Sequence, residues 1–170
     1  FMRFGGFGTG ENVNPEEFLA YAEPVENITV PESVEEIRYS AFANCENLES
    51  VTIPKSVKFI GADAFYKCEK LTTIDIDEDN ENYSFENGVL FDKDKTVLIQ
   101  CVALNADTSY TVPSSVEHIN HNAFPLYVTT ESITIPKSVD LIEQYAFYDC
   151  NSLKDIYYFG TETQWNKIDI

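Results

Sequence analysis

One acidic stretch has the residue types and the spacing of a calcium-binding loop. In DIDEDNENYSFE, Asp75, Asp77 and Asp79 occupy positions 1, 3 and 5, and Glu86 falls on position 12. A twelve-residue calcium loop supplies oxygen ligands from these positions. Position 6, however, is Asn80 where the loop needs glycine for its sharp turn, and a strand-like run precedes it in place of a helix. We therefore interpret the stretch as a solvated acidic turn with no metal, and keep a calcium loop as the alternative.

Two histidines and a set of repeated serines are the other residues that could do chemistry. His118 and His121 form an H-x-x-H pair, but zinc needs three or four ligands and the sequence shows no third one. One serine recurs before valine at the same place in four repeats: Ser33, Ser56, Ser115 and Ser138. A catalytic serine has no reason to recur, so hydrogen bonds in turns explain these residues better. The GGFGTG segment follows no strand and lacks the lysine of a phosphate-binding loop. The sequence thus predicts no catalytic residue, no cofactor and no enzyme.

The serines recur because the chain repeats a unit of about 23 residues. SVEEIRYSAFANC, SVKFIGADAFYKC and SVDLIEQYAFYDC keep Ser, Val, Ile, Ala-Phe and Cys while the residues between them change. Ile28, Val51 and Ile74 are 23 residues apart, whereas 36 residues separate Ile74 from Tyr110, so one repeat carries an insertion of 36 minus 23, or 13 residues. Such a period, with one alternating apolar segment and one aromatic segment, is typical of a leucine-rich repeat solenoid.

Each unit combines a short strand, a proline and a tight turn. In LESVTIP, Val51 and Ile53 alternate with polar residues and point inward, and the proline ends the strand because it cannot donate to a ladder. In AFYKC, Phe65 and Cys68 are three apart, which predicts a helical or 3₁₀ turn. Stacking of the units is expected to build an aromatic spine, with Phe42 on Phe65 and Phe124 on Phe147.

These patterns predict an α/β solenoid, a right-handed leucine-rich repeat stack of short parallel strands and short helical or 3₁₀ turns. We expect a flexible glycine-rich leader at residues 1–14, an N-terminal capping half-repeat at 15–27, the solenoid at 28–156 and a C-terminal cap at 157–170. Inside the solenoid, the β-like runs GVLF and TVLI joined by DKDK predict a β-hairpin insertion at about 82–109.

Four cysteines leave two alternatives open. Cys45, Cys68 and Cys150 occupy one repeat position, whereas Cys101 does not, and this recurrence favours a packing role as small buried side chains. The alternative is a disulfide between Cys45 and Cys68, because stacked strands lie about 5 Å apart.

The charge of the chain excludes two classes of partner. Lys and Arg number 11 against 29 Asp and Glu, a formal charge of −18. Such a chain repels phosphate backbones and anionic lipid, so we expect no nucleic acid partner. No run of about 18 apolar residues is present, so we expect no membrane insertion, and the N-terminal FMRFGGFGTG lacks the apolar core of a signal peptide.

The repeat resembles a known family. IPKSVKFIGADAFYKCEKLTTI, together with the insertion NYSFENGVLFDKDKTVLI and the ending IYYFGTETQWNKI, is similar to the BspA-like leucine-rich repeats, also called the Treponema pallidum type. The resemblance covers about residues 19–170. It departs at Arg38, where the repeat usually has glycine, and in AFPLYVTTES, which lacks the Cys and Leu. The resemblance implies a bacterial protein, on the cell surface or secreted, that adheres to host or neighbouring-cell proteins.

Partner binding is expected on two outward-facing rows, because solenoids use such extended faces. The first row follows the strands and contains Thr29, Thr52, Asp75, Thr134 and Tyr157. The second contains Phe59 and Leu141, which are apolar where exposed residues are expected. They are candidates to anchor a partner, and burial against an adjacent loop is the alternative. We therefore predict a non-enzymatic protein-interaction or adhesion module. The alternatives are a calcium-dependent module, a passive spacer, or a carbohydrate-contacting module with a stacking platform of Tyr157, Tyr158 and Trp165.

Overall fold

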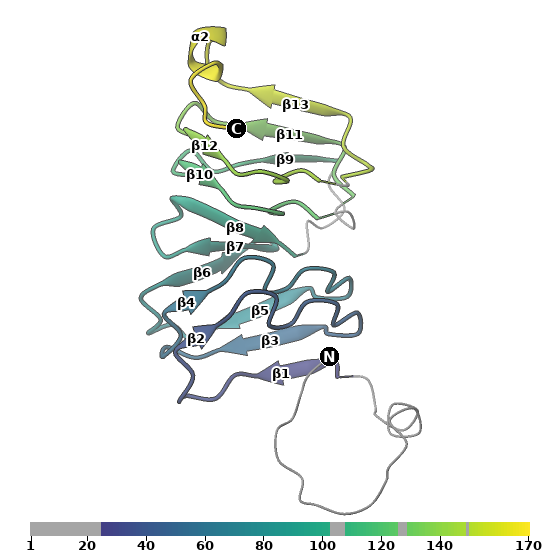
Figure 1. Ribbon diagram of the computed structural model, residues 1–170, viewed down its shortest axis with the longest axis vertical. Coiled ribbons are helices and arrows are strands. Elements are labelled where there is room, and N and C mark those ends of the chain that lie inside the picture. The colour runs from purple at the N-terminus through teal and green to yellow at the C-terminus, as the bar shows by residue number, and fades with distance from the viewer. Residues whose placement is uncertain (1–24, 103–107, 126–128, 149) are drawn as a thin grey trace, which may run out of the picture.

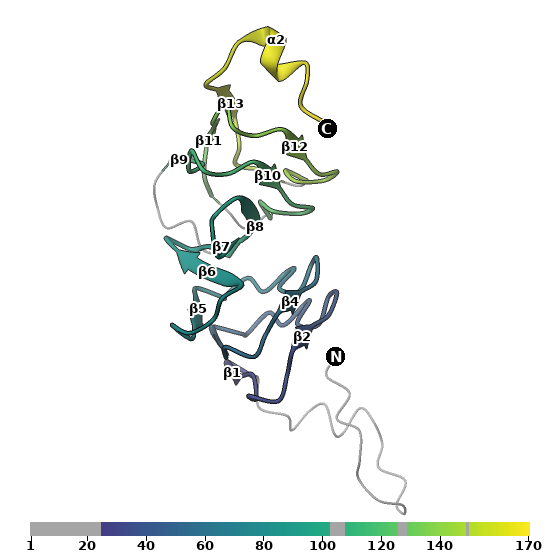
Figure 2. The ribbon, with the colours of Figure 1, turned by 90° about the vertical axis from the view of Figure 1, so that its left-hand side faces the viewer.

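The computed structural model describes residues 25–102, 108–125, 129–148 and 150–170, and these residues form a solenoid with two columns of strands (Figures 1 and 2). The long-strand column contains β1 (Asn27–Thr29), β3 (Ser50–Ile53), β5 (Thr73–Ile76), β9 (Ser109–Thr111), β11 (Ser132–Ile135) and β13 (Asp155–Tyr158). The short-strand column contains β2 (Glu36–Ile37), β4 (Phe59–Ile60), β10 (His118–Ile119) and β12 (Leu141–Ile142). The expected leader and most of the expected N-terminal cap lie outside the described residues.

The strands stack in the register that the 23-residue period predicts. Ile28 pairs with Val51 and Val51 with Ile74, all in parallel, so residues one period apart lie directly above one another. A proline follows the inward residue at the end of a long strand, as in Ile53–Pro54. Proline has no N–H to donate to the neighbouring strand, so the ladder ends there. The predicted solenoid of mostly parallel strands is confirmed.

The helical part of the prediction is wrong, because the AFYKC segment forms a run of separate tight turns. The Ala64 N–H donates to the Gly61 carbonyl and the Cys68 N–H to the Phe65 carbonyl, each at 3.2 Å. Asp63 and Lys67 between them have left-handed backbone angles, with φ of 59° and 57°. A left-handed residue ends any right-handed helix, so the turns cannot merge into one.

The predicted aromatic spine is present in both halves of the stack. The Phe42 and Phe65 rings are stacked with centroids 5.6 Å apart, and the Phe124 and Phe147 rings with centroids 5.0 Å apart. The inserted coil interrupts the spine, because Cys101 takes the phenylalanine position there: its N–H donates to the Ala123 carbonyl, as the Phe42 and Phe124 N–H groups donate to the corresponding alanines.

The insertion is a three-stranded meander rather than a single hairpin. The predicted hairpin joins β7 (Val89–Asp92) to β8 (Val97–Cys101), and a second one joins β6 (Tyr83–Glu86) to β7 through Asn87 and Gly88. Both loop residues have positive φ, 50° and 80°, as a two-residue hairpin turn requires. β8 then pairs in parallel with β10 and so returns the chain to the short-strand column.

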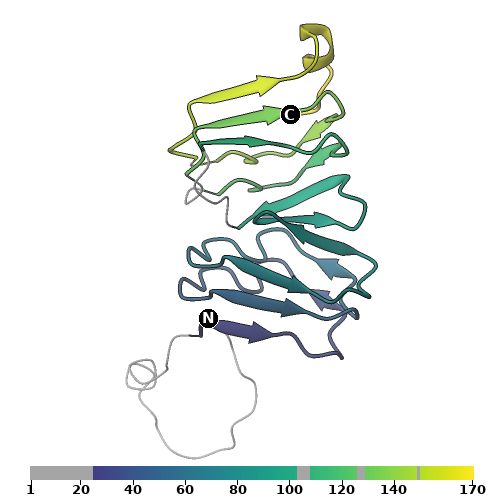
Figure 3. The same ribbon diagram turned by 180° about the vertical axis from the view of Figure 1, so that it is seen from behind.

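The insertion divides the hydrophobic core into two clusters. Figure 3 shows the teal strands of the insertion between the blue coils below and the green coils above. β7 is buried on both faces: Leu90 belongs to the lower cluster with Phe65, whereas Val89 and Phe91 belong to the upper cluster with Phe124. One strand therefore connects two cores.

The C-terminal segment covers one column of the upper end. α2 (Glu162–Trp165) is the one helix among the described residues, and a capping box of Thr161 and Gln164 begins it. The Ile142 N–H donates to the Asp169 carbonyl at 2.8 Å, so the tail pairs with β12. None of the described helices is long and apolar enough to cross a membrane.

Candidate functional site

The outward residues of the long strands form the first predicted row, but in two separate parts. Thr29, Thr52 and Asp75 lie opposite one another across β1, β3 and β5. Thr134 and Tyr157 lie opposite one another across β11 and β13. No hydrogen-bonded pairing joins these two three-stranded sheets among the described residues, because the meander lies between them. The row is thus a polar face interrupted at its middle.

A hollow marks the place of this interruption. It has a volume of about 280 Å³ and lies between β5 and the meander. Asp75, Asp77 and Glu78 line one side, and Phe85 of β6 and Lys93 line the other. Asp75 is the one member that the sequence-based row contains. Glu78, two residues beyond the end of β5, was not part of the predicted row. Phe85 and Lys93 were missed, because their proximity to β5 depends on how the meander folds back.

Three of the four carboxylates of the alternative calcium loop, those of Asp77, Asp79 and Glu86, are engaged in separate contacts. Asp77 Oδ1 accepts a hydrogen bond from the Asp79 N–H at 2.9 Å, and Asp79 pairs with Lys55 at 3.6 Å. Glu86 ends β6 and pairs with Lys95 at the next turn of the meander. Within the described residues, no three His, Cys, Asp or Glu side chains are placed to hold a metal ion. The geometry therefore does not support the calcium alternative.

Asn80, which departs from the calcium pattern, anchors the meander to the coil below. It is fully buried, and its Nδ2 donates to the carbonyls of Pro54 and Val57 at 2.9 and 3.1 Å. Its Oδ1 accepts from the N–H groups of Asn82 and Tyr83 at 2.8 and 3.0 Å. Asn80 occupies the position where a calcium loop has glycine, and its side chain instead forms hydrogen bonds with four backbone groups.

The two histidines pair with different carboxylates. His118 Nε2 lies 3.0 Å from Glu143 Oε1, and His121 Nε2 lies 3.9 Å from Asp63 Oδ2. The Asn122 amide also donates to Asp63, at 2.8 Å, across the inserted coil. In the inserted coil, Cys101 lies three positions after Leu98. In the next coil, the equivalent residues Ile119 and Phe124 are five positions apart, so the inserted coil is shorter here.

The contact between Asp63 and Asn122 therefore fills the space that the shorter coil leaves. The residues are 59 positions apart, and no sequence signal predicts that they meet. Each histidine faces a carboxylate of its own, so the pair does not make the shared site that zinc would need.

The repeated serines hold neighbouring coils together. The hydroxyls of Ser56 and Ser138 donate to the carbonyls of Val34 and Val116 at 2.8 and 2.7 Å. The prediction of hydrogen-bonding serines is confirmed, with the correction that the bonds cross between repeats. Among the described residues, none of these bonds places a serine hydroxyl on a histidine, as an activated nucleophile would require.

The second predicted row is only partly available to a partner. Phe59 is 40% exposed and packs edge-on against Tyr39, with centroids 5.8 Å apart. Leu141 is half-buried, because Asp169 of the C-terminal tail bridges to its backbone. Phe59 thus stays on the surface, and Leu141 lies beneath the tail.

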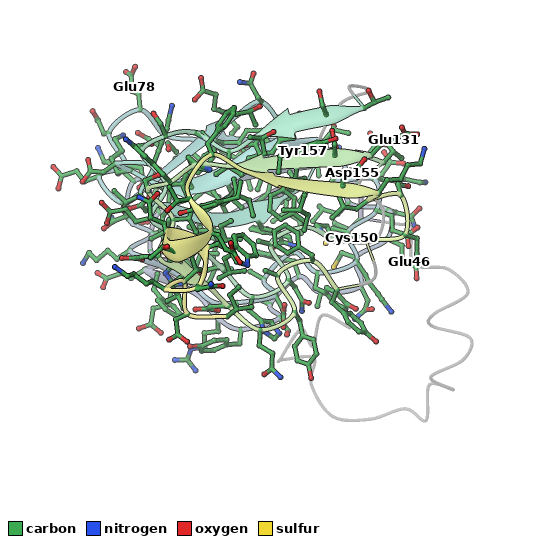
Figure 4. The ribbon with its side chains drawn as sticks, turned by 90° about the horizontal axis from the view of Figure 1, so that it is seen from above. Glu46, Glu78, Glu131, Cys150, Asp155 and Tyr157 are labelled. Atoms are coloured by element: carbon green, nitrogen blue, oxygen red, sulfur yellow. The ribbon has the colours of Figure 1, made fainter. Side chains whose placement is uncertain are left out.

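The aromatic residues of β13 do not form the stacking platform that a carbohydrate site would need. Neighbouring residues of a strand point to opposite faces. Tyr157 is 56% exposed, whereas Tyr158 packs inward on Trp165 with ring centroids 5.3 Å apart. Figure 4 looks down the stack and shows Tyr157 and Asp155 on this uppermost long strand. Of these three aromatic residues, Tyr157 alone lies on the strand face.

Cys68 and Cys101 are buried, and Cys45 and Cys150 are half-buried. Cys45, Cys68 and Cys101 are free thiols, so the alternative of a Cys45–Cys68 disulfide is not formed. The thiols of Cys68 and Cys150 donate to the carbonyls of Phe42 and Phe124, at 3.0 and 2.8 Å. Burial raises the pKa of Cys68 to about 12 and that of Cys101 well above its ordinary value, so both stay protonated and unreactive at neutral pH.

Comparisons with solved structures find bacterial leucine-rich repeat proteins. The pneumococcal vaccine antigen PcpA is 29% identical with a TM-score of 0.66, covering 78% of this chain and 39% of that one. A leucine-rich repeat protein from Eubacterium ventriosum is 28% identical with a TM-score of 0.62, covering 79% of this chain and 42% of that one. This chain therefore spans about two fifths of the length of either structure. No curated protein matches it.

The family comparison is the more extensive one. The model of the BspA type leucine rich repeat region matches residues 12–93 and 100–168 in six copies. These ranges include the described coils on both sides of the meander, so the family resemblance of the sequence is confirmed. This chain belongs to the family of BspA type leucine-rich repeat proteins.

Proposed function

We propose that this chain is a non-enzymatic module of a bacterial protein, displayed on the cell surface or secreted, that binds partner proteins through its long-strand face. The observation that supports this most strongly is the face itself. Its outward residues are polar and stay partly or fully exposed from Thr29 to Tyr157, while the inward residues Val51, Ile74 and Ile133 pack into the core clusters. A rigid surface whose outward residues can vary without disturbing the core is suited to recognition.

The similarity to a pneumococcal vaccine antigen supports an exposed location, because an antigen must be accessible to antibodies. The partners are host or neighbouring-cell proteins. The net charge of −18 favours partners with basic surfaces and accelerates their encounter.

Surface plasmon resonance over a panel of host matrix and plasma proteins tests this function. An unrelated protein of equal acidity serves as the charge control, and all binding is measured at physiological ionic strength because screening removes weak non-specific attraction. We expect at least one panel protein to bind saturably and more strongly than it binds the control.

Two matched variants locate the binding face. Tyr157→Ala removes an exposed tyrosine from the strand face, and Tyr148→Ala removes one of similar exposure, 53% against 56%, from the turn segment. We expect Tyr157→Ala to weaken binding about tenfold, as for an interface tyrosine, and Tyr148→Ala to leave it unchanged. Equal effects of both variants, or no saturable binding to any panel protein, would favour the passive spacer.

A further inference from the structure

β5 is an edge strand in the middle of the solenoid. It pairs with β3 alone, so one side of its backbone has no strand partner among the described residues. The Thr73 and Asp77 N–H groups donate to the carbonyls of β3's coil, at 3.4 and 3.0 Å. Alternate residues of a parallel strand face opposite neighbours, so the amides and carbonyls of Ile74 and Ile76 face the open side.

The equivalent groups in other coils are hydrogen-bonded. Ile76 occupies the repeat position of Val30, whose N–H donates to the Thr52 carbonyl at 3.0 Å. The Val112 N–H makes the same bond to the Thr134 carbonyl, also at 3.0 Å. The next long strand would supply this acceptor for Ile76, but the chain enters the meander there instead. β5 is thus one strand short of the pairing that the repeat makes elsewhere.

The hollow described above lies at this open side. Its volume of about 280 Å³ is bounded by Ile74 and Ile76 on β5 and by Tyr83, Ser84 and Phe85 on β6. β6 is not hydrogen-bonded to β5, so it forms the far wall of the hollow rather than the missing strand. The half-buried side chain of Phe85 makes part of this wall apolar.

The charge at the rim indicates the chemistry of an occupant. Asp75 and Glu78 are exposed and form no ion pair with another described residue. The cation of Lys93 is directed to the Asn80 carbonyl instead. The rim therefore presents two available carboxylates beside backbone groups that have no partner in the described part of the chain, and lysine or arginine side chains complement the carboxylates.

We infer that the open edge of β5 binds an extended, basic segment of a partner protein as an added strand, with lysine or arginine side chains on Asp75 and Glu78. Main-chain bonds to Ile74 and Ile76 supply the pairing, and the carboxylates select the charge. A second copy of this chain does not fit this role, because both copies carry a net charge of −18. The inference deepens the proposed function and rests on it.

A synthetic peptide tests the inference directly. The probe is a short fluorescein-labelled peptide of alternating lysine and valine, and its control is the same peptide with N-methyl groups on the amides of one edge. N-methylation keeps the charge but blocks strand pairing. By fluorescence anisotropy at physiological ionic strength, we expect the unmodified peptide to bind saturably and the methylated one about tenfold more weakly.

Protein variants of equal charge change locate the site. Asp75→Asn with Glu78→Gln should weaken peptide binding about fivefold, since two exposed ion pairs are lost. Glu46→Gln with Glu69→Gln removes the same charge from a distant surface, because Glu46 lies at the opposite side of the molecule from Glu78 (Figure 4) and Glu69 is one period above it. This control should leave binding unchanged.

Amide exchange gives a readout at the backbone itself. In the free protein, the Ile74 and Ile76 amides should exchange faster than those of Val51 and Ile53, which face β5 across the ladder. The peptide should slow the exchange of Ile74 and Ile76 selectively.

Three results would overturn the inference: no saturable binding, equal binding of both peptides, or equal loss in both double variants. If a panel protein still binds the strand face and tolerates Asp75→Asn with Glu78→Gln, the inference fails while the proposed function stands.

Discussion

Gly61 shows how closely the coils approach one another. A Cβ at this position would lie 2.5 Å from the Tyr39 nitrogen and 2.8 Å from the Arg38 carbonyl carbon, both backbone atoms of the coil below. The Gly61 N–H also donates to the Ile37 carbonyl at 2.8 Å, so the backbones cannot separate without losing that bond. Arg38 occupies the same repeat position one coil earlier and is exposed, which explains why a large side chain is accepted there.

We expect Gly61→Ala to lower the free energy of unfolding by about 1–3 kcal/mol, the usual cost of overpacking. Urea denaturation followed by circular dichroism measures this change. Arg38→Ala is the matched control and should have almost no effect, since its ion pair with Glu36 is exposed. Equal stability of Gly61→Ala and the unmodified chain would contradict the close backbone contact.

The buried thiol of Cys68 makes stability depend on alkaline pH. Burial raises its pKa from the ordinary 9.0 to about 12, and burial likewise raises the pKa of Tyr83. Above pH 9 the unfolded chain loses the thiol proton while the folded chain keeps it, so the unfolded state is favoured progressively until the folded pKa is reached. The contribution of Cys68 is therefore complete below pH 9 and is lost as the pH rises towards about 12.

Cys68→Ser tests this dependence, because a hydroxyl can still donate to the Phe42 carbonyl but does not titrate in this range. Between pH 9 and 11, the free energy of unfolding of the unmodified chain should fall more steeply than that of the variant, by at most about 1.4 kcal/mol per pH unit. Urea titrations under reducing conditions at several pH values measure both slopes. Parallel slopes would show that Cys68 titrates normally in the folded protein.

Among the elements, the meander depends on one buried side chain. Asn80→Ala would leave the N–H groups of Asn82 and Tyr83 without their acceptor and would remove one donor from each of two carbonyls, so we expect a loss of about 2–4 kcal/mol in the free energy of unfolding. Asn82→Ala is the control, because that half-buried side chain makes one long bond of 3.4 Å to the Val57 carbonyl. The same urea assay compares the two variants. A loss no greater than that of Asn82→Ala would show that the meander is held by its strand pairing alone.

The elements differ in how far sequence reasoning could predict them. Val51 and Ile74 are both β-branched apolar residues and lie one 23-residue period apart, so the period predicts that they pair across β3 and β5. The turn at Lys67 was misread as helical because lysine has no preference for left-handed angles, and only the structure reveals its φ of 57°. The Asn87–Gly88 hairpin could have been recognised, since this dipeptide is a strong turn signal between two apolar runs.

The candidate site was predictable only in part, for a physical reason. Asp75 and Tyr157 were placed correctly on the strand face, because a period of two residues determines which side chains point outward. The open edge of β5 and the approach of Phe85 depend on where the meander leaves and re-enters the stack. No repeat specifies that path.

For the whole molecule, the two core clusters raise the question of whether the solenoid unfolds as one unit. Coils of a solenoid contact mainly their neighbours, so stability is close to a sum of local terms and nearest-neighbour interfaces. The Asp63–Asn122 hydrogen bond across the inserted coil is an exception. The meander is the interface between the halves, and β7 carries residues of both clusters side by side. Leu90 packs into the lower cluster and Phe91 into the upper one, and both side chains are almost fully buried.

These adjacent residues allow a matched test of coupling. Leu90→Ala and Phe91→Ala should each cost about 2–5 kcal/mol, since each leaves a cavity in a packed core. Amide hydrogen exchange measured by NMR then shows which strands lose stability in each variant. We expect Leu90→Ala to accelerate exchange mainly in β3 and β4, and Phe91→Ala mainly in β10 and β11, because each cavity adjoins one cluster. Equal acceleration throughout both halves in both variants would instead mean that the meander couples the two cores into a single cooperative unit.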